Sequence, residues 1–407
     1  MLQTVLEADR ARILSSLIRT CGGDFDLAEE ALHDAVVAAT TQWPQQGAPD
    51  APDAWLLQTA RHKAIDAIRR DQRTRRKFEA LGHITNLGQE GVETSPIPDD
   101  MLRLIFTCCH PALSEEAQLA LTLRTVVGLP TNEIARAFLV SEQTMAQRLV
   151  RAKKKIRDAG IPYRVPERSE MPERLEAALL VIYLVFNEGY SASSGERVVR
   201  QELCAHAIRI GRILSDLMPK ESETLGLLAL MLLQDSRRRA RMTDDGNLVL
   251  LRDQDRTLWN REEIGEGLRL CREARRAQPS GVYAIQAAIA AEHARAVSAD
   301  DTDWEQIVRL YQELLGARPT PVVALNHAVA TAMVYGAENA LRLVDTLAVD
   351  LDGYGPFHAA RADFYRTTGR WAEAEDAYRR AIALATNDPE RRFLESRLNG
   401  VRNTKLD

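Results

Sequence analysis

The sequence predicts an all-α protein, and three observations support this. Apolar residues recur at helical spacing from the first segment of the chain to the last. No segment shows the sustained alternation of apolar and polar residues that is typical of strands. The composition, with 45% hydrophobic and 27% charged residues and many Ala, Leu, Arg and Glu, favours helix. The 407 residues are enough for roughly two to four domains.

The first helical domain is predicted over residues 1–80. Asp24 and Asp26 are candidate starts for an acidic, Ala-rich helix. We expect that helix to end near Gln42, because Pro44 and the GAPDAPD stretch after it are breakers. A further helical segment is predicted over 53–77.

This domain presents two faces of opposite charge. The acidic face is formed by Asp26, Glu29, Glu30, His33 and Asp34. The basic rim is formed by Arg61, His62, Lys63, Arg69, Arg70 and Arg73. Either face alone is usually a solvated helix surface. Together they suggest a protein-docking face beside a nucleic-acid face.

A linker is predicted over 81–98, which is rich in Gly, Thr, Ser and Pro, and a second helical domain over 99–160. Within it, 130–157 has the layout of a helix-turn-helix, with Ser141 as the N-cap of the second helix. Gln and Arg on that helix can read base edges, and the basic run after them can neutralise phosphate. The candidate DNA-binding residues are Ser141, Gln143, Thr144, Gln147, Arg148, Arg151 and Lys154. A solvated amphipathic helix is the alternative.

A helical extension follows the Pro-containing stretch at 161–172, with one domain predicted over 173–280 and a repeat region over 281–400. In the repeat region, small and aromatic residues fit the tetratricopeptide spacing: Ala362, Tyr365, Gly369, Ala374, Tyr378 and Ala381. Clustered polar residues lie beside apolar helices, among them Asn187, Glu188, Tyr190, Asp253, Asp255 and Arg256. Caps and ion pairs explain them, and a regulatory contact with the N-terminal domains is the sharper hypothesis.

Charge, cysteines and motifs exclude several classes of protein. The net charge of −5 excludes a uniformly basic nucleic-acid binder, although 69–77 and 148–157 each carry six basic residues. The start of the chain lacks a signal-peptide pattern and no long apolar run occurs, so we expect a cytoplasmic protein without a membrane partner. Adjacent Cys108 and Cys109 favour apolar packing, so we expect no metal and no cofactor. Nucleotide-binding and hydrolase motifs are absent, and an enzyme is not expected.

The stretch DFDLAEEALHDAV (24–36) resembles the D-x-A-E-[DE]-x-x-Q-[DE] signature of sigma-factor region 2. AWLLQTARHKAIDAIRR (54–70) resembles the W-L-x-x-x-A-R-N-x-x-x-D-x-x-R stretch that follows it, and 113–157 resembles region 4. The short linker without a region 3 is similar to the extracytoplasmic-function class of the sigma-70 family. Residues 161–407 resemble the long tetratricopeptide-containing extension of one subgroup of that class.

The resemblance implies a role for each surface. The acidic helix face would dock on core RNA polymerase, and the basic rim together with Asp66 would hold the promoter −10 element. The second helix of the helix-turn-helix would enter the −35 major groove. The extension would regulate this activity, and a regulatory protein could bind its repeats. His33 stands where the family usually has Gln, and His62 stands where it often has Asn. The departure at His62 leaves the preferred −10 base open.

The alternative function is a stand-alone helix-turn-helix regulator with a tetratricopeptide protein-binding scaffold. The acidic face at 26–39 discriminates between the two, because a stand-alone regulator has no use for it.

Overall fold

The computed structural model of the chain describes residues 2–79, 97–138, 140–190, 197–243, 245–277, 279–385 and 388–406. In these residues the regular structure is helical, apart from one isolated antiparallel bridge between Met242 and Leu248, which confirms the all-α prediction. None of these helices has both the length and the apolar character needed to cross a membrane. The chain forms two compact units, Met1–Val185 and Phe186–Asp407, called unit 1 and unit 2 below.

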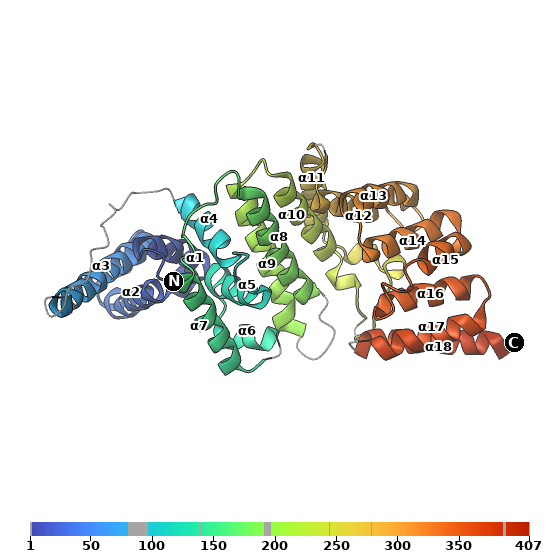
Figure 1. The fold of residues 1–407 in the computed structure, drawn as a ribbon, viewed down its shortest axis with the longest axis horizontal. Helices are drawn as coiled ribbons and strands as arrows, with labels where there is room; N and C mark the ends of the chain where they lie inside the picture. The colour runs from blue at the N-terminus through green and yellow to red at the C-terminus, as the bar shows by residue number, and fades with distance from the viewer. Residues whose placement is uncertain are drawn as a thin grey trace. The chain divides into compact units, whose positions relative to one another are not determined.

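Unit 1 begins with a three-helix bundle, continues with a block of shorter helices, and ends inside a helix that the two units share (Figure 1). The helices are α1 (Leu2–Thr20), α2 (Phe25–Gln46), α3 (Pro52–Glu79), α4 (Ile97–Cys108), α5 (Glu115–Thr122), the π-helical turn η1 (Leu123–Val127), α6 (Thr131–Ala137), α7 (Glu142–Asp158) and α8 (Met171–Tyr190). The predicted linker lies outside the described residues up to 96, and its last two residues already belong to α4.

The bundle forms because each of its helices buries one apolar stripe. Leu14 and Leu17 of α1, Leu32 of α2 and Leu56 of α3 are almost completely buried. As predicted, Asp24 caps α2, and its carboxylate accepts hydrogen bonds from the backbone N–H groups of residues 26 and 27 at 3.0 and 3.1 Å.

The predicted end of α2 near Gln42 is wrong, because the helix continues through Pro44 to Gln46. Proline has no N–H for the carbonyl one turn earlier, but that carbonyl belongs to the exposed Thr40 and water can satisfy it. The last turn is held by packing, since the rings of Trp43 and Trp55 meet edge to face with centroids 5.6 Å apart.

The second part of unit 1 is built around the buried side of α4 and the cysteines at its end. Cys108 Sγ lies 3.0 Å from Thr125 Oγ1, and Cys109 Sγ lies 3.6 Å from Thr122 Oγ1. Burial raises the pKa of Cys109 to about 11 and raises that of Cys108 further. Both thiols are therefore protonated packing groups of the core.

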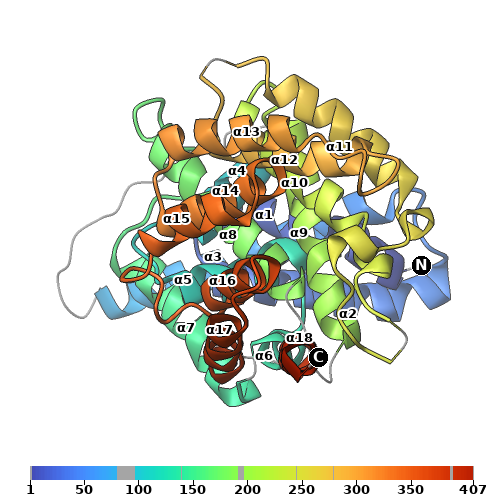
Figure 2. The same cartoon turned by 90° about the vertical axis from the view of Figure 1, so that its right-hand side faces the viewer.

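Unit 2 is a succession of α-helices, with three 3₁₀ turns between α10 and α11 (Figures 1 and 2). They are α9 (Arg197–Leu217), α10 (Ser222–Asp235), the 3₁₀ turns η2 (Arg238–Ala240), η3 (Leu251–Asp253) and η4 (Arg256–Leu258), α11 (Arg261–Ala274), α12 (Val282–Arg295), α13 (Trp304–Ala317), α14 (Pro321–Tyr335), α15 (Ala337–Asp345), α16 (Gly355–Thr367), α17 (Trp371–Leu384) and α18 (Asp388–Leu406).

Helix α10 is the centre of the first half of unit 2. Its sequence is apolar on all sides, and it is buried from Thr224 to Leu233, with α9, α11 and α12 around it. Gly226 allows the closest approach, because a Cβ there would lie 2.5 Å from the backbone nitrogen of Ala284 in α12.

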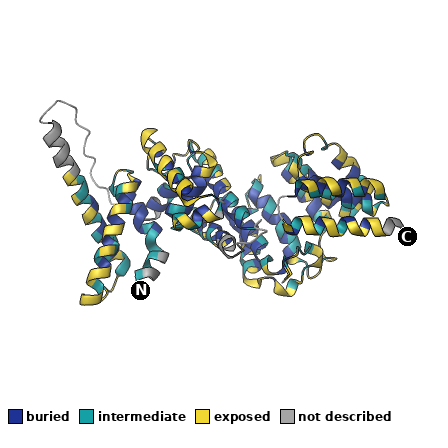
Figure 3. Cartoon of the chain, turned by 90° about the horizontal axis from the view of Figure 1, so that it is seen from below, coloured by how far each residue is buried: buried dark blue, intermediate teal, exposed yellow. Residues whose placement is uncertain are grey.

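Five of the six residues of the predicted tetratricopeptide spacing meet inside the hairpin of α16 and α17, and the sixth, Gly369, is exposed in the turn between these helices. Ala362, Ala374 and Ala381 are completely buried, and Tyr378 is 1% exposed in the same apolar cluster. Figure 3 shows such buried inner sides and exposed outer sides along the helices of each unit. The small residues let the helices approach, and the aromatic side chain fills the space between them.

Candidate nucleic-acid interface

The recognition face predicted on α7 is exposed. Helix α6 and helix α7 form the expected helix-turn-helix, and the described part of the turn between them includes Val140. The buried stripe consists of Met145, Leu149, Ala152 and Ile156, as the sequence predicts. The opposite side presents exposed Gln143, Gln147, Arg151 and Lys154. This side can meet a nucleic-acid groove without disturbing the core.

The first turn of α7 is fixed by its cap. Ser141 Oγ accepts a hydrogen bond from the backbone N–H of Thr144 at 3.1 Å and lies 2.8 Å from the Thr144 hydroxyl. These two side chains therefore set the orientation of the helix start, which is the part of a helix-turn-helix recognition helix that generally reaches base edges.

Arg148 is the one predicted recognition residue on α7 with an ion-pair partner in the described residues. Its guanidinium lies 3.0 Å from the carboxylate of Glu116 in α5, whose side chain is 69% exposed. An ion pair this exposed contributes about 0.2–1 kcal/mol, so Arg148 can exchange Glu116 for another acceptor at small cost.

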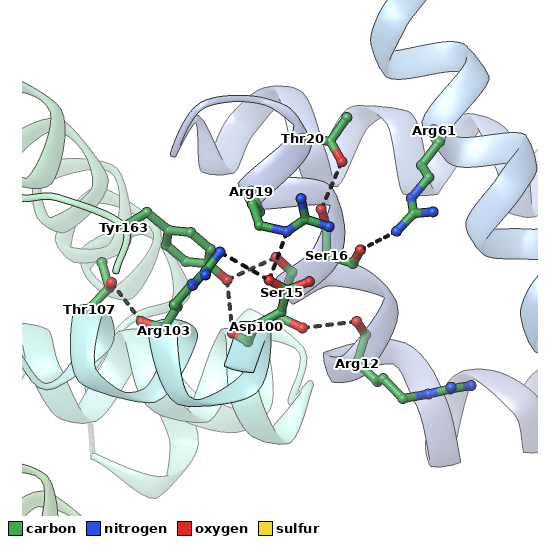
Figure 4. Close-up of polar contacts among 10 residues, drawn as sticks. All are labelled: Arg12, Ser15, Ser16, Arg19, Thr20, Arg61, Asp100, Arg103, Thr107 and Tyr163. Atoms are coloured by element: carbon green, nitrogen blue, oxygen red, sulfur yellow. Dashed lines mark hydrogen bonds and ion pairs between the residues drawn. The ribbon is translucent and has the colours of Figure 1, made fainter. Parts of the chain in front are cut away.

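The basic rim of α3 is mostly exposed, with one exception. His62, Lys63, Asp66, Arg69 and Arg70 face solvent, whereas the side chain of Arg73 lies outside the described residues. Arg61 points into the bundle instead. There its guanidinium donates to Ser16 Oγ of α1 at 2.7 Å (Figure 4). The structure thus gives Arg61 a bundle contact and leaves the other described members of the rim outside.

A polar hollow connects the two charged faces predicted in the bundle. It has a volume of about 540 Å³ and is lined by Asp34 of α2 and by Lys63, Asp66, Arg69 and Arg70 of α3. Positive side chains flanked by two carboxylates can hold a phosphate or hydrogen-bond the edge of a base. The sequence assigned Asp34 and the basic rim to separate partners, whereas the structure brings them to one place.

The acidic face of α2 is divided. Glu30, His33 and Asp34 are exposed. Asp26, which is also exposed, and the half-buried Glu29 lie 3.0 and 2.8 Å from Nζ of Lys153, which comes from α7. The helix-turn-helix therefore reaches the acidic face of the bundle within unit 1.

A second polar cluster, which no local sequence pattern indicates, connects the bundle to the helix-turn-helix block (Figure 4). The fully buried carboxylate of Asp100 in α4 lies 2.8 Å from Arg19 Nε of α1 and 3.5 Å from Arg103 Nη1. The Tyr163 hydroxyl lies 2.9 Å from the carbonyl oxygen of Ser15 and 3.2 Å from that of Asp100. Burial raises the pKa of Tyr163 well above its ordinary value, so the hydroxyl keeps its proton and donates it.

The polar residues singled out in the extension make contacts inside unit 2. Tyr190 accepts a hydrogen bond from Arg237, and the guanidinium of Arg241 lies 3.5 Å from the centre of its ring. Asp255 caps η4, and Arg256 donates to the carbonyl oxygens of residues 293 and 296 at 2.7 and 2.8 Å. A cap, hydrogen bonds and a cation–π contact thus account for these three residues. Exposed Asp253 lies 3.7 Å from Arg252, whereas Asn187 and Glu188 are half-buried at the end of α8.

Three family models match the chain. Sigma-70 region 2 matches residues 8–74, Sigma-70 region 4 matches 103–156, and a family of unknown function (DUF6596) matches 174–275. An uncharacterized protein of Rhizobium meliloti (strain 1021) is 45% identical over 399 residues, which cover 97% of this chain and 94% of that protein. The first match covers most of the α1–α3 bundle, and the second covers the helix-turn-helix block.

Proposed function

Because the chain is a sigma-70 family factor with a C-terminal helical extension, we propose that it is an extracytoplasmic-function sigma factor of the cytoplasm. It binds core RNA polymerase through the acidic face of α2 and directs it to promoters. The basic rim of α3 and the polar hollow hold the −10 element, and α7 reads the −35 element.

The observation that carries this proposal is the pair of exposed polar surfaces on the two family-matched segments of unit 1. The first is the basic rim of α3, and the second is the side of α7 that carries Gln143, Gln147 and Arg151. A stand-alone regulator needs only the second surface. A subunit that contacts a promoter at two elements needs both.

The test is transcription in vitro with the full chain, core RNA polymerase and a promoter of the chain's own operon. We expect promoter-specific transcripts only when both proteins are present. Tight, sequence-specific binding of the chain to duplex promoter DNA without core polymerase, combined with no stimulation of core, would favour the stand-alone regulator.

We further propose that unit 2 regulates unit 1, and that its repeat-like hairpins bind a regulatory protein. Unit 1 continues to Val185, and Arg174 of α8 donates a hydrogen bond to the carbonyl oxygen of Phe106 in α4. A truncation that tests regulation should therefore end after Tyr190, where α8 ends, rather than directly after the helix-turn-helix. A change in promoter-specific transcription relative to the full chain is expected, and equal transcription argues against regulation.

A further inference from the structure

Lys153 is distinguished from its neighbours on α7 by its burial and its partners. Its side chain is 12% exposed, and Nζ lies between the carboxylates of Asp26 and Glu29 at 3.0 and 2.8 Å. The adjacent Lys154 and Lys155 are exposed. A single ammonium between two carboxylates forms a charge-assisted contact with both, which is stronger than an isolated surface pair.

The contact of Lys153 is supported by two further contacts between the bundle and the helix-turn-helix block. The first is the cluster around Asp100, whose buried carboxylate has Arg19 of α1 as its nearest cation, at 2.8 Å. The second is Arg10 of α1, which donates to the carbonyl oxygen of Arg124 in η1 at 3.1 Å. A buried carboxylate that loses its cation is strongly disfavoured, so the Asp100 cluster selects this closed arrangement.

The closed arrangement has a consequence for the proposed docking of polymerase, and the inference rests on that proposed function. The two carboxylates that Lys153 contacts belong to the acidic face of α2. A cationic surface of core polymerase would compete with Lys153 for these two groups, most directly for Glu29, whose side chain is 21% exposed, whereas that of Asp26 is 65% exposed.

We propose that α7 acts as an autoinhibitory latch: in the free protein Lys153 occupies Asp26 and Glu29, and core polymerase binds only after this contact opens. The Asp100 cluster is the anchor: it holds the helix-turn-helix block against the bundle, so that Lys153 stays beside Asp26 and Glu29. The apparent affinity for core polymerase then equals the affinity of the open form multiplied by the fraction of molecules that are open.

The latch is tested first in the free full-length chain, without polymerase or DNA. Spin labels are attached at Val37→Cys in α2 and Val150→Cys in α7, since these side chains are 50% and 65% exposed. Native thiols compete weakly, because burial raises the pKa of the half-buried Cys21 to about 12, and the other four cysteines are buried. The distance between the labels is measured by pulsed electron resonance.

Lys153→Glu should shift the labels to a longer and broader distance distribution. Lys155→Glu, which makes the same charge change at an exposed site of the same helix, should leave it unchanged. Asp100→Asn should lengthen the distance by releasing the anchor, and it provides a second route if one variant folds poorly. Unchanged distances in both Lys153→Glu and Asp100→Asn would overturn the proposal.

The second measurement is the affinity of each full-length variant for core RNA polymerase in the absence of DNA. Lys153→Glu should bind core roughly three- to tenfold more tightly than the wild type, and Lys155→Glu should bind like the wild type. Longer label distances without tighter binding would overturn the competition between Lys153 and core. If neither the wild type nor any variant binds core polymerase, the proposed function is wrong. The distances between the spin labels then decide by themselves whether Lys153 holds α7 against α2.

Discussion

Arg148 offers a quantitative test of the recognition helix, because the structure gives both the contact that it must leave and the one that it would gain. In the free protein its guanidinium pairs with Glu116 at 3.0 Å, and the exposure of that carboxylate limits the pair to about 0.2–1 kcal/mol. A bidentate contact to a base edge contributes about 1–3 kcal/mol of discrimination. The DNA contact is therefore expected to win.

The perturbation is Arg148→Ala, with Glu116→Gln as the matched variant that removes only the competing partner. We expect Arg148→Ala to lower transcription from a promoter with an intact −35 element by roughly 5- to 150-fold. Glu116→Gln should leave it unchanged or raise it by up to about fivefold, since it frees Arg148 at no cost to DNA binding.

The assay is single-round transcription in vitro with saturating core polymerase, on the natural promoter and on versions with single −35 substitutions. Thermal unfolding of each variant serves as the folding control. The expected loss is confined to promoters that carry the base read by Arg148. Equal losses on every −35 version would refute base readout and assign Arg148 to phosphate contact or to packing on α5.

Three other predictions concern the interior contacts of the two units. Arg61→Ala should lower the stability of unit 1 by about 1.5–3 kcal/mol in chemical denaturation, because it removes a charged hydrogen bond to Ser16. The preference of the variant among −10 sequences should stay the same. An altered −10 preference at normal stability would indicate that Arg61 contacts the DNA instead. Burial and the charge of Asp235 raise the pKa of Glu263 to about 7, so the stability linked to its proton is complete below about pH 4.5 and is lost as the pH rises through about 7. Glu263→Gln should accordingly unfold at the same temperature as the wild type near pH 4.5. At pH 8 the variant should be more stable than the wild type, by on the order of 1–2 kcal/mol after allowance for partial exposure. A constant stability difference between pH 4.5 and 8 would contradict the raised pKa of Glu263. Gly226→Ala should destabilise unit 2 by about 1–3 kcal/mol, because the added Cβ would meet the backbone of α12. Gly265→Ala, with open space around its site, should stabilise unit 2 by about 0.5–1 kcal/mol. A reversed order of the two variants in thermal denaturation would contradict the close approach of α10 and α12.

The local features of unit 1 could be predicted from the sequence because they depend on residues close together in the chain. Ser141 was predicted as a cap, and Met145, Leu149, Ala152 and Ile156 as one buried stripe, and the structure confirms both predictions. Of the two predicted starts of α2, Asp24 and Asp26, the structure selects Asp24. Capping and helical periodicity act over one to four residues, and a single sequence carries that information.

The same reasoning was wrong at the end of α2 and incomplete for Arg61. Pro44 is a strong local breaker, but Trp43 packs on Trp55 and the helix continues. Arg61 belongs to a basic stretch, but Ser16, 45 residues earlier, is its partner. In both cases a tertiary contact outweighs a local preference, and no local pattern indicates which contact will form.

The sequence by itself determined the helical class, the order of the two DNA-binding segments and the exposed face of α7. Only the tertiary structure decided that Lys153, one of six basic residues in a run that looks uniformly solvated, is instead held by Asp26 and Glu29. It also decided that Asp100, Arg19 and Tyr163 meet in one buried cluster. The physical reason is separation along the chain: these groups are 63 to 127 residues apart, and their pairing depends on how packed helices bring them together.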